Sequence, residues 1–169
     1  GVTTAYFLKK AGHEVTVIDA NPYPAMLTSH ANGGQLSSSN AEVWNSWSNV
    51  YKGIKWSFKR DAPLKLRYDF DFRKYKWLIQ FMANIKHAKK NTIETTKMAM
   101  ESIQIMRTEF ADIEYDQSDC GIMHIYKNQK DLDHAIEINK LYKEGGLHRT
   151  EINPNMIKLK EPKINADDC

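Results

Sequence analysis

The first nineteen residues change from helical to extended spacing of their apolar side chains. Residues Val2–Ala11 carry apolar side chains at helical intervals, and Gly12 follows as a typical stop signal. The next run, Glu14–Ile18, is β-branched without strict alternation, as in a parallel strand covered on both faces. Asp19 closes that run. The pattern predicts a helix over residues 2–11 and a strand over residues 14–18.

Helical spacing returns several times further along the chain. Pro24 precedes a stretch with the length of one or two helical turns, which we expect to end near Asn32. The other predicted helices are residues 50–58, 72–88, 92–111, 131–144 and 155–160. Between them the period changes to that of strands at residues 113–115, 121–126 and 147–152, the first two as an antiparallel pair.

This order of elements predicts an α/β fold class with two parts. Residues 1–40 are interpreted as a partial Rossmann-like nucleotide-binding domain. Residues 41–169 are interpreted as a helix-rich α+β portion, and the family resemblance given below implies that this portion is a substrate-domain insert. A nicotinamide dehydrogenase would follow Asp19 quickly with another helix and a third parallel strand, and this chain does not.

The opening pattern is the second half of a βαβ dinucleotide-binding unit. In such units the third glycine of G-x-G-x-x-G opens the helix, and an acidic residue about 20 positions on binds the ribose hydroxyls. Gly1 occupies the place of the third glycine and Asp19 that of the acid, so the first strand and two glycines would lie upstream. Two alternatives stay open: an α/β unit that binds no nucleotide, and an Asp19 that only caps the turn before Asn21.

A segment of small and amide side chains follows about ten residues after the predicted strand. Glycine backbone and amide groups at such a place can approach a planar, hydrogen-bonding ligand closely. The candidate cofactor-binding residues are Gly1, Asp19, Ser29, Asn32, Gly33, Gly34 and Gln35.

These residues resemble a known family. The runs G-V-T-T-A-Y-F-L, A-G-H-E-V-T-V-I-D and T-S-x-A-N-x-G-Q, with I-K-W at 54–56 and A-P-L at 62–64, are similar to the small subunit of bacterial D-amino acid dehydrogenases. These are flavoproteins related to glycine and sarcosine oxidases. The resemblance covers roughly the first two-fifths of a family member, so we expect the chain to be a fragment that is inactive alone.

The resemblance implies FAD as cofactor and places Ser29, Asn32, Gly34 and Gln35 against it. It implies oxidative deamination of a D-amino acid to a 2-oxo acid and ammonia, with electrons passing from flavin to an acceptor. A respiratory-chain acceptor and dioxygen both stay open as that acceptor. The Arg and Tyr that grip the substrate carboxylate in the family would lie beyond Cys169. No catalytic residue is therefore assigned.

Composition changes this picture little. A net charge of +3, with lysines mixed among acids, argues against a nucleic-acid partner. Cys120 and Cys169 form neither a disulfide framework nor a metal site, and we expect a cytoplasmic protein without a metal. Aromatic and basic residues over 42–70 suit either packing on the domain or peripheral contact with the inner membrane.

Two rival functions stay open. The chain could belong to an NAD-dependent dehydrogenase, or be a non-catalytic helical interaction fragment. His124 is the strand histidine that we consider as a candidate to face a cavity, although a lone histidine is more often structural than catalytic. No Ser-His-Asp, HExxH or phosphate-loop pattern is present.

Overall fold

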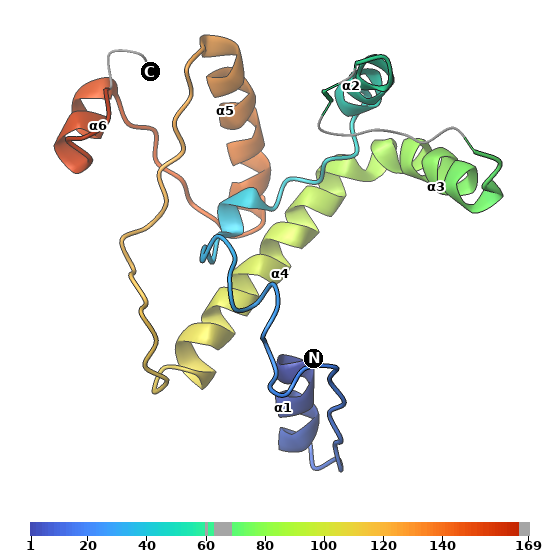
Figure 1. Ribbon diagram of the computed structural model, residues 1–169. Helices are drawn as coiled ribbons and strands as arrows, with labels where there is room; N and C mark the ends of the chain where they lie inside the picture. Colours follow the sequence, from blue (N-terminus) through green and yellow to red (C-terminus); the bar gives the residue numbers. More distant parts are fainter. Residues whose placement is uncertain (60, 63–68, 166–169) are drawn as a thin grey trace. The chain divides into compact units, whose positions relative to one another are not determined.

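The computed structural model describes residues 1–59, 61–62 and 69–165. The chain divides into two compact units, Gly1–Leu36 and Ser37–Cys169, and each is described by itself. Among the described residues the regular elements are all helical (Figure 1). The prediction of a domain boundary at residue 40 stays a prediction.

The first unit contains helix α1, Val2–Lys10, which confirms the predicted helix to within one residue. Lys9 and Lys10 lie in its last turn, where positive charge interacts favourably with the helix dipole. Gly12 then adopts φ +88°, a left-handed conformation that favours glycine and ends the helix.

The predicted strand at Glu14–Ile18 is wrong for this structure: the segment is neither helix nor strand, and Ile18 is 92% exposed. A parallel strand is stabilised by backbone hydrogen bonds to neighbouring strands, and the first unit, residues 1–36, contains no strand that could supply them. The helical turns predicted after Pro24 are also wrong. Ala25 has φ +65°, which interrupts a right-handed helix, and the segment forms turns instead.

The second unit begins with a 3-10 turn, η1 (Ser38–Asn40), and continues into α2 (Trp47–Ser57) and α3 (Phe72–Ala83). Ser46 caps α2 by accepting a hydrogen bond from the Asn49 N–H, and Asp71 caps α3 in the same manner through Arg73 N–H. The predicted helix over 50–58 is confirmed with an earlier start. The A-P-L motif at 62–64, which is part of the family resemblance, lies mostly outside the described residues.

Three further helices agree with the predicted pattern. The helix predicted over 72–88 ends earlier, in a 3-10 turn η2 (Asn84–His87), and α4 (Ala88–Glu109) follows at once. Next come α5 (Gln129–Glu144), capped by Asn128, and α6 (Pro154–Lys160), capped by Asn153 with Pro154 at its start.

The strands predicted at 113–115, 121–126 and 147–152 are wrong for this structure, because these stretches are extended or irregular without a ladder. A two-stranded pair alone is marginally stable in water. The predicted α/β and α+β fold classes are therefore not seen in full, because the described residues form no strand.

The small core of the second unit lies where α5 and η1 pack on α4 (Figure 1). Thr96 is fully buried there at 0% exposure. Its hydroxyl donates to the carbonyl of Thr92 one turn earlier, so its polar group is satisfied. Among the described residues, the others that are buried are Ser38, Ala41, Thr92, Ala135, Tyr142, Gly145 and Ile157.

Gly145, at the end of α5, permits this close approach of helices. A Cβ at this position would lie 2.6 Å from the Thr96 Cβ and 3.0 Å from the Ile93 carbonyl oxygen. The absence of a side chain is thus what allows the end of α5 to contact α4.

Candidate functional site

The first predicted site residue, Gly1, precedes α1 as its N-cap. Its carbonyl oxygen accepts a hydrogen bond from the Ala5 N–H at 3.0 Å. A Cβ at Gly1 would meet nothing within 4 Å, so the backbone here is open to approach. The first N–H groups of a helix lack partners within the helix, which favours an anionic ligand in front of them.

Asp19 lies at the end of the extended segment with its carboxylate turned onto the following turn. Its Oδ1 accepts hydrogen bonds from the Asn21 backbone N–H at 2.8 Å and from the Asn21 side-chain amide at 3.1 Å. The backbone hydrogen bond is the main cause that holds the pKa of Asp19 below its usual value. Asp19 is therefore a charged turn cap; its contact with a ribose stays a prediction.

Asp19 and Ser29 line the same hollow in the first unit, which has a volume of about 430 Å³. Its lining side chains are largely exposed, so the hollow is shallow and open to solvent. Exposed apolar side chains form much of the wall, including Ile18 and Leu27 at 92% and 72% exposure. The remaining lining residues are Ala20, Asn21, Ala25, Met26 and Thr28.

Asn32 and Gly34 form a compact turn next to this hollow in the sequence. The Asn32 amide nitrogen donates to the Thr28 carbonyl at 3.0 Å, and its Oδ1 accepts from the Gly34 N–H at 2.7 Å. Gly34 has φ +62°, a conformation that favours glycine. Gly33 and Gln35 are exposed and do not line the hollow. The structure thus brings Asp19 and Ser29 together and uses Asn32 to shape the turn that follows.

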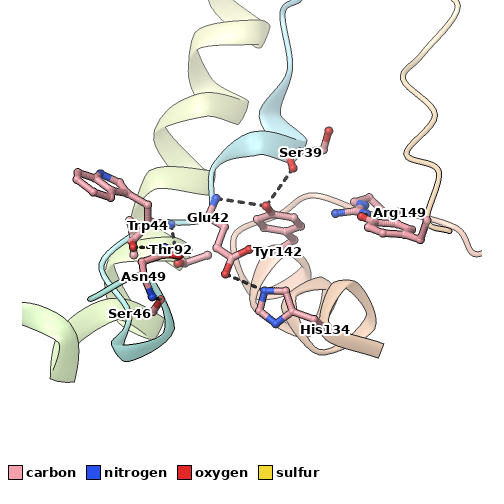
Figure 2. A network of polar contacts seen from close by, with 11 residues as sticks. Ser39, Glu42, Trp44, Ser46, Asn49, Thr92, His134, Tyr142 and Arg149 are labelled. Atoms are coloured by element: carbon pink, nitrogen blue, oxygen red, sulfur yellow. Dashed lines mark hydrogen bonds and ion pairs between the residues drawn. The ribbon is translucent and has the colours of Figure 1, made fainter. Parts of the chain in front are cut away.

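A polar network in the second unit was not predicted from the sequence (Figure 2). The Tyr142 hydroxyl, on α5, donates to the Ser39 carbonyl at 3.0 Å and accepts from the Glu42 N–H at 3.2 Å. Glu42 Oε1 also pairs with His134 Nε2 at 3.1 Å. No sequence signal marks these partners, because Tyr142 lies 100 positions beyond Glu42.

His124 has a structural partner, which agrees with the structural interpretation of this histidine. Its Nε2 lies 2.7 Å from the Ser39 hydroxyl oxygen. Burial, and then the nearby charge of Arg149, lower the pKa of His124. Arg149 itself donates to the Tyr126 hydroxyl at 3.1 Å and stacks over the Tyr142 ring.

The described residues contain no cluster of three or more side chains suited to hold a metal ion. Within the same residues, the helices are too short or too polar to cross a membrane.

Comparison with known proteins assigns the chain to a family. A family model described as FAD dependent oxidoreductase matches residues 1–167. A relative from Mesorhizobium japonicum named D-amino acid dehydrogenase 3 is 46% identical over 169 residues, which cover 98% of this chain and 41% of the relative. No solved structure matches the chain significantly.

Two further relatives carry the name D-amino acid dehydrogenase. The protein from Paramagnetospirillum magneticum is 36% identical over 172 residues, which cover 98% of this chain and 40% of the relative. The protein from Dechloromonas aromatica is 32% identical over 171 residues, which cover 98% of this chain and 41% of the relative. The chain thus spans about two-fifths of the length of these relatives. With a family match over nearly all of its residues, the chain belongs to the FAD-dependent oxidoreductase family.

Proposed function

We propose that the whole protein oxidatively deaminates D-amino acids to 2-oxo acids and ammonia, passing electrons from FAD to an acceptor. The observation that carries this proposal is the 46% identity, along 98% of the chain, to a protein named D-amino acid dehydrogenase 3. The match to an FAD-dependent family argues against the NAD-dependent alternative.

The residues of the first unit fit a dinucleotide such as FAD. The open backbone at Gly1 suits a diphosphate, and the charged Asp19 carboxylate suits hydroxyl donors of a ribose. Ser29, with Asp19, lines the hollow that would take part of the cofactor. We assign the candidate contacts to Gly1, Asp19, Ser29, Asn32, Gly33, Gly34 and Gln35, within a Rossmann-like domain completed in the whole protein.

Bound FAD would supply the redox chemistry by accepting hydride from the substrate α-carbon. The task of this chain is to bind and orient. Asn32 shapes the turn ahead of Gly34, and the Asp19 carboxylate would fix the adenosine end of the cofactor. Domain 1–40 would serve the cofactor, and residues 41–169 would form part of the substrate domain.

The test is purification of the whole protein followed by spectroscopy and assay. We expect a yellow protein with the blue-light absorption of flavin, which D-amino acids bleach in the absence of an acceptor. With an artificial electron-accepting dye, D-amino acids should yield 2-oxo acid and ammonia, and the L-enantiomers serve as the matched control. A colourless protein that reduces NAD would contradict the proposal.

We also propose a cytoplasmic location with peripheral contact at the inner membrane through α2. Trp47, Tyr51 and Phe58 are 65%, 68% and 84% exposed at helical spacing. The sequence interleaves them with Lys52 and Lys55. Exposed aromatic rings with lysines suit an anionic lipid surface. Such a location would bring reduced flavin to a respiratory-chain acceptor.

The aromatic and basic segment over residues 42–70 packs partly within the second unit, and part of it lies outside the described residues. Trp44 contacts Trp77 and Phe81 with ring centroids 6.2 Å and 4.8 Å apart, respectively, whereas residues 60 and 63–68 are not described. We expect the whole protein to sediment with vesicles that contain anionic lipid and less with purely zwitterionic vesicles. Replacing Trp47 and Phe58 by serine should reduce this binding. Equal recovery in the supernatant with both vesicle types would indicate that the face packs against protein instead.

A further inference from the structure

Helix α3 carries two apolar faces, although one such face is enough to pack a helix onto a protein core. On the first face Leu78 and Phe81 are half-buried, and the centroid of the Phe81 ring lies 4.8 Å from that of Trp44. The second face is exposed, with Phe72 and Ile79 at 85% and 63% exposure. We call it the outer stripe; its members recur three and four positions apart and are Phe72, Tyr75, Ile79 and Met82. An apolar stripe exposed along a helix is typical of an interaction surface.

The charges around the outer stripe have one sign. Residues 72–93, which form α3, η2 and the start of α4, contain no aspartate or glutamate. Their basic residues are Arg73, Lys74, Lys76, Lys86, Lys89 and Lys90. Arg73 and Lys74 pair with acids that precede the run, whereas the other four are exposed and have no acidic partner among the described residues. Lys76 adjoins the stripe, one helical turn after Phe72 and one before Ile79.

A helix with apolar side chains on one face and lysines beside them suits a lipid surface, because headgroup phosphates pair with the cations while the apolar side chains enter the interface. We propose that the outer stripe of α3 docks on an anionic lipid surface, with Lys76 at the headgroups. A second copy of this run would instead bring like charges together, and an apolar protein surface would leave the lysines without counter-charge. This inference rests on the peripheral location proposed above and adds a surface on a helix other than α2.

The test measures binding of the whole protein to vesicles of phosphatidylcholine with phosphatidylglycerol, and to vesicles of phosphatidylcholine alone. We expect Ile79→Ser, which removes an apolar side chain from the outer stripe, to weaken binding to the anionic vesicles about fivefold. Lys76→Gln should also weaken it about fivefold, the contribution of one lysine near an anionic surface. The loss caused by Lys76→Gln should shrink at high salt, because salt screens the charge.

Each variant has a matched control away from α3. Met98→Ser removes an exposed apolar side chain from α4, and Lys130→Gln removes an exposed lysine from α5. Both controls should bind the anionic vesicles like the wild type. All four variants should keep the wild-type melting temperature, bound flavin and rate of D-amino acid oxidation with the artificial dye, because the replaced side chains are exposed and none belongs to the candidate cofactor contacts.

The outcomes separate this inference from the proposed function. Wild-type protein without flavin would contradict the proposed function. Wild-type protein that holds flavin but binds neither vesicle type would overturn the lipid inference alone, as would Ile79→Ser and Lys76→Gln variants of unchanged vesicle affinity. An Ile79→Ser variant that melts earlier in the absence of vesicles, yet binds them like the wild type, would show that protein covers the stripe. If Ile79→Ser fails to fold, Lys76→Gln decides by itself.

Discussion

Replacing Gly145 by alanine should lower the free energy of unfolding by about 1–3 kcal/mol, the usual cost of forcing extra volume into a packed contact. The added Cβ would lie 2.6 Å from the Thr96 Cβ and 3.0 Å from the Ile93 carbonyl oxygen. Thr96 is fully buried, so neither it nor the α4 backbone can move away into solvent. Gly145 has φ −82°, so the cost is steric and not conformational.

The measurement is thermal or denaturant unfolding of the whole protein, with Gly53→Ala as the matched control. Gly53 lies inside α2, and a Cβ there would meet nothing within 4 Å. The control should therefore stabilise the helix by about 0.5–1 kcal/mol through reduced backbone entropy. A Gly145→Ala variant as stable as the wild type would show that α5 does not approach α4 as closely as described.

Changing Asp19 to asparagine should weaken FAD binding about tenfold in the whole protein. Asparagine retains an oxygen that can accept from the Asn21 N–H, so the local turn survives. What disappears is the negative charge, and charge-assisted hydrogen bonds to ribose hydroxyls contribute roughly 1.5–3 kcal/mol. Asp19→Ala, which removes both turn cap and charge, should weaken binding further.

This pair of variants separates the two roles of Asp19. If the carboxylate only caps the turn, Asp19→Asn will bind FAD like the wild type and only Asp19→Ala will differ. Glu14→Gln provides a matched loss of one charge on an exposed side chain of the same unit and should leave affinity unchanged. Titration of the apoprotein with FAD, followed by flavin fluorescence, measures all four proteins.

The sequence predicted the helices well because their signals are local. Apolar spacing located α1 to within one residue and α5 to within two at its start. The capping residues Asn128 and Asn153 each satisfy a backbone N–H within three residues, so the information that begins a helix lies beside it. Helical hydrogen bonds join residues four apart and need no distant partner.

The predicted strands fail for the opposite reason. Residues 14–18 have the β-branched composition of a buried parallel strand, yet such a strand depends on neighbours supplied by other segments. Likewise, the turns after Pro24 depend on the positive φ of Ala25, a conformation that alanine does not signal in the sequence.

By itself, the sequence determined most of the helices and the family resemblance, because both depend on residues that are close together along the chain. Only the tertiary structure decided that Asp19 and Ser29 share one hollow and that Tyr142 bonds to Ser39 and Glu42. These relations join a turn to a neighbouring turn, or a helix to a segment 100 residues earlier. They follow from how the folded chain packs, and the local spacing of residues does not indicate which distant groups come into contact.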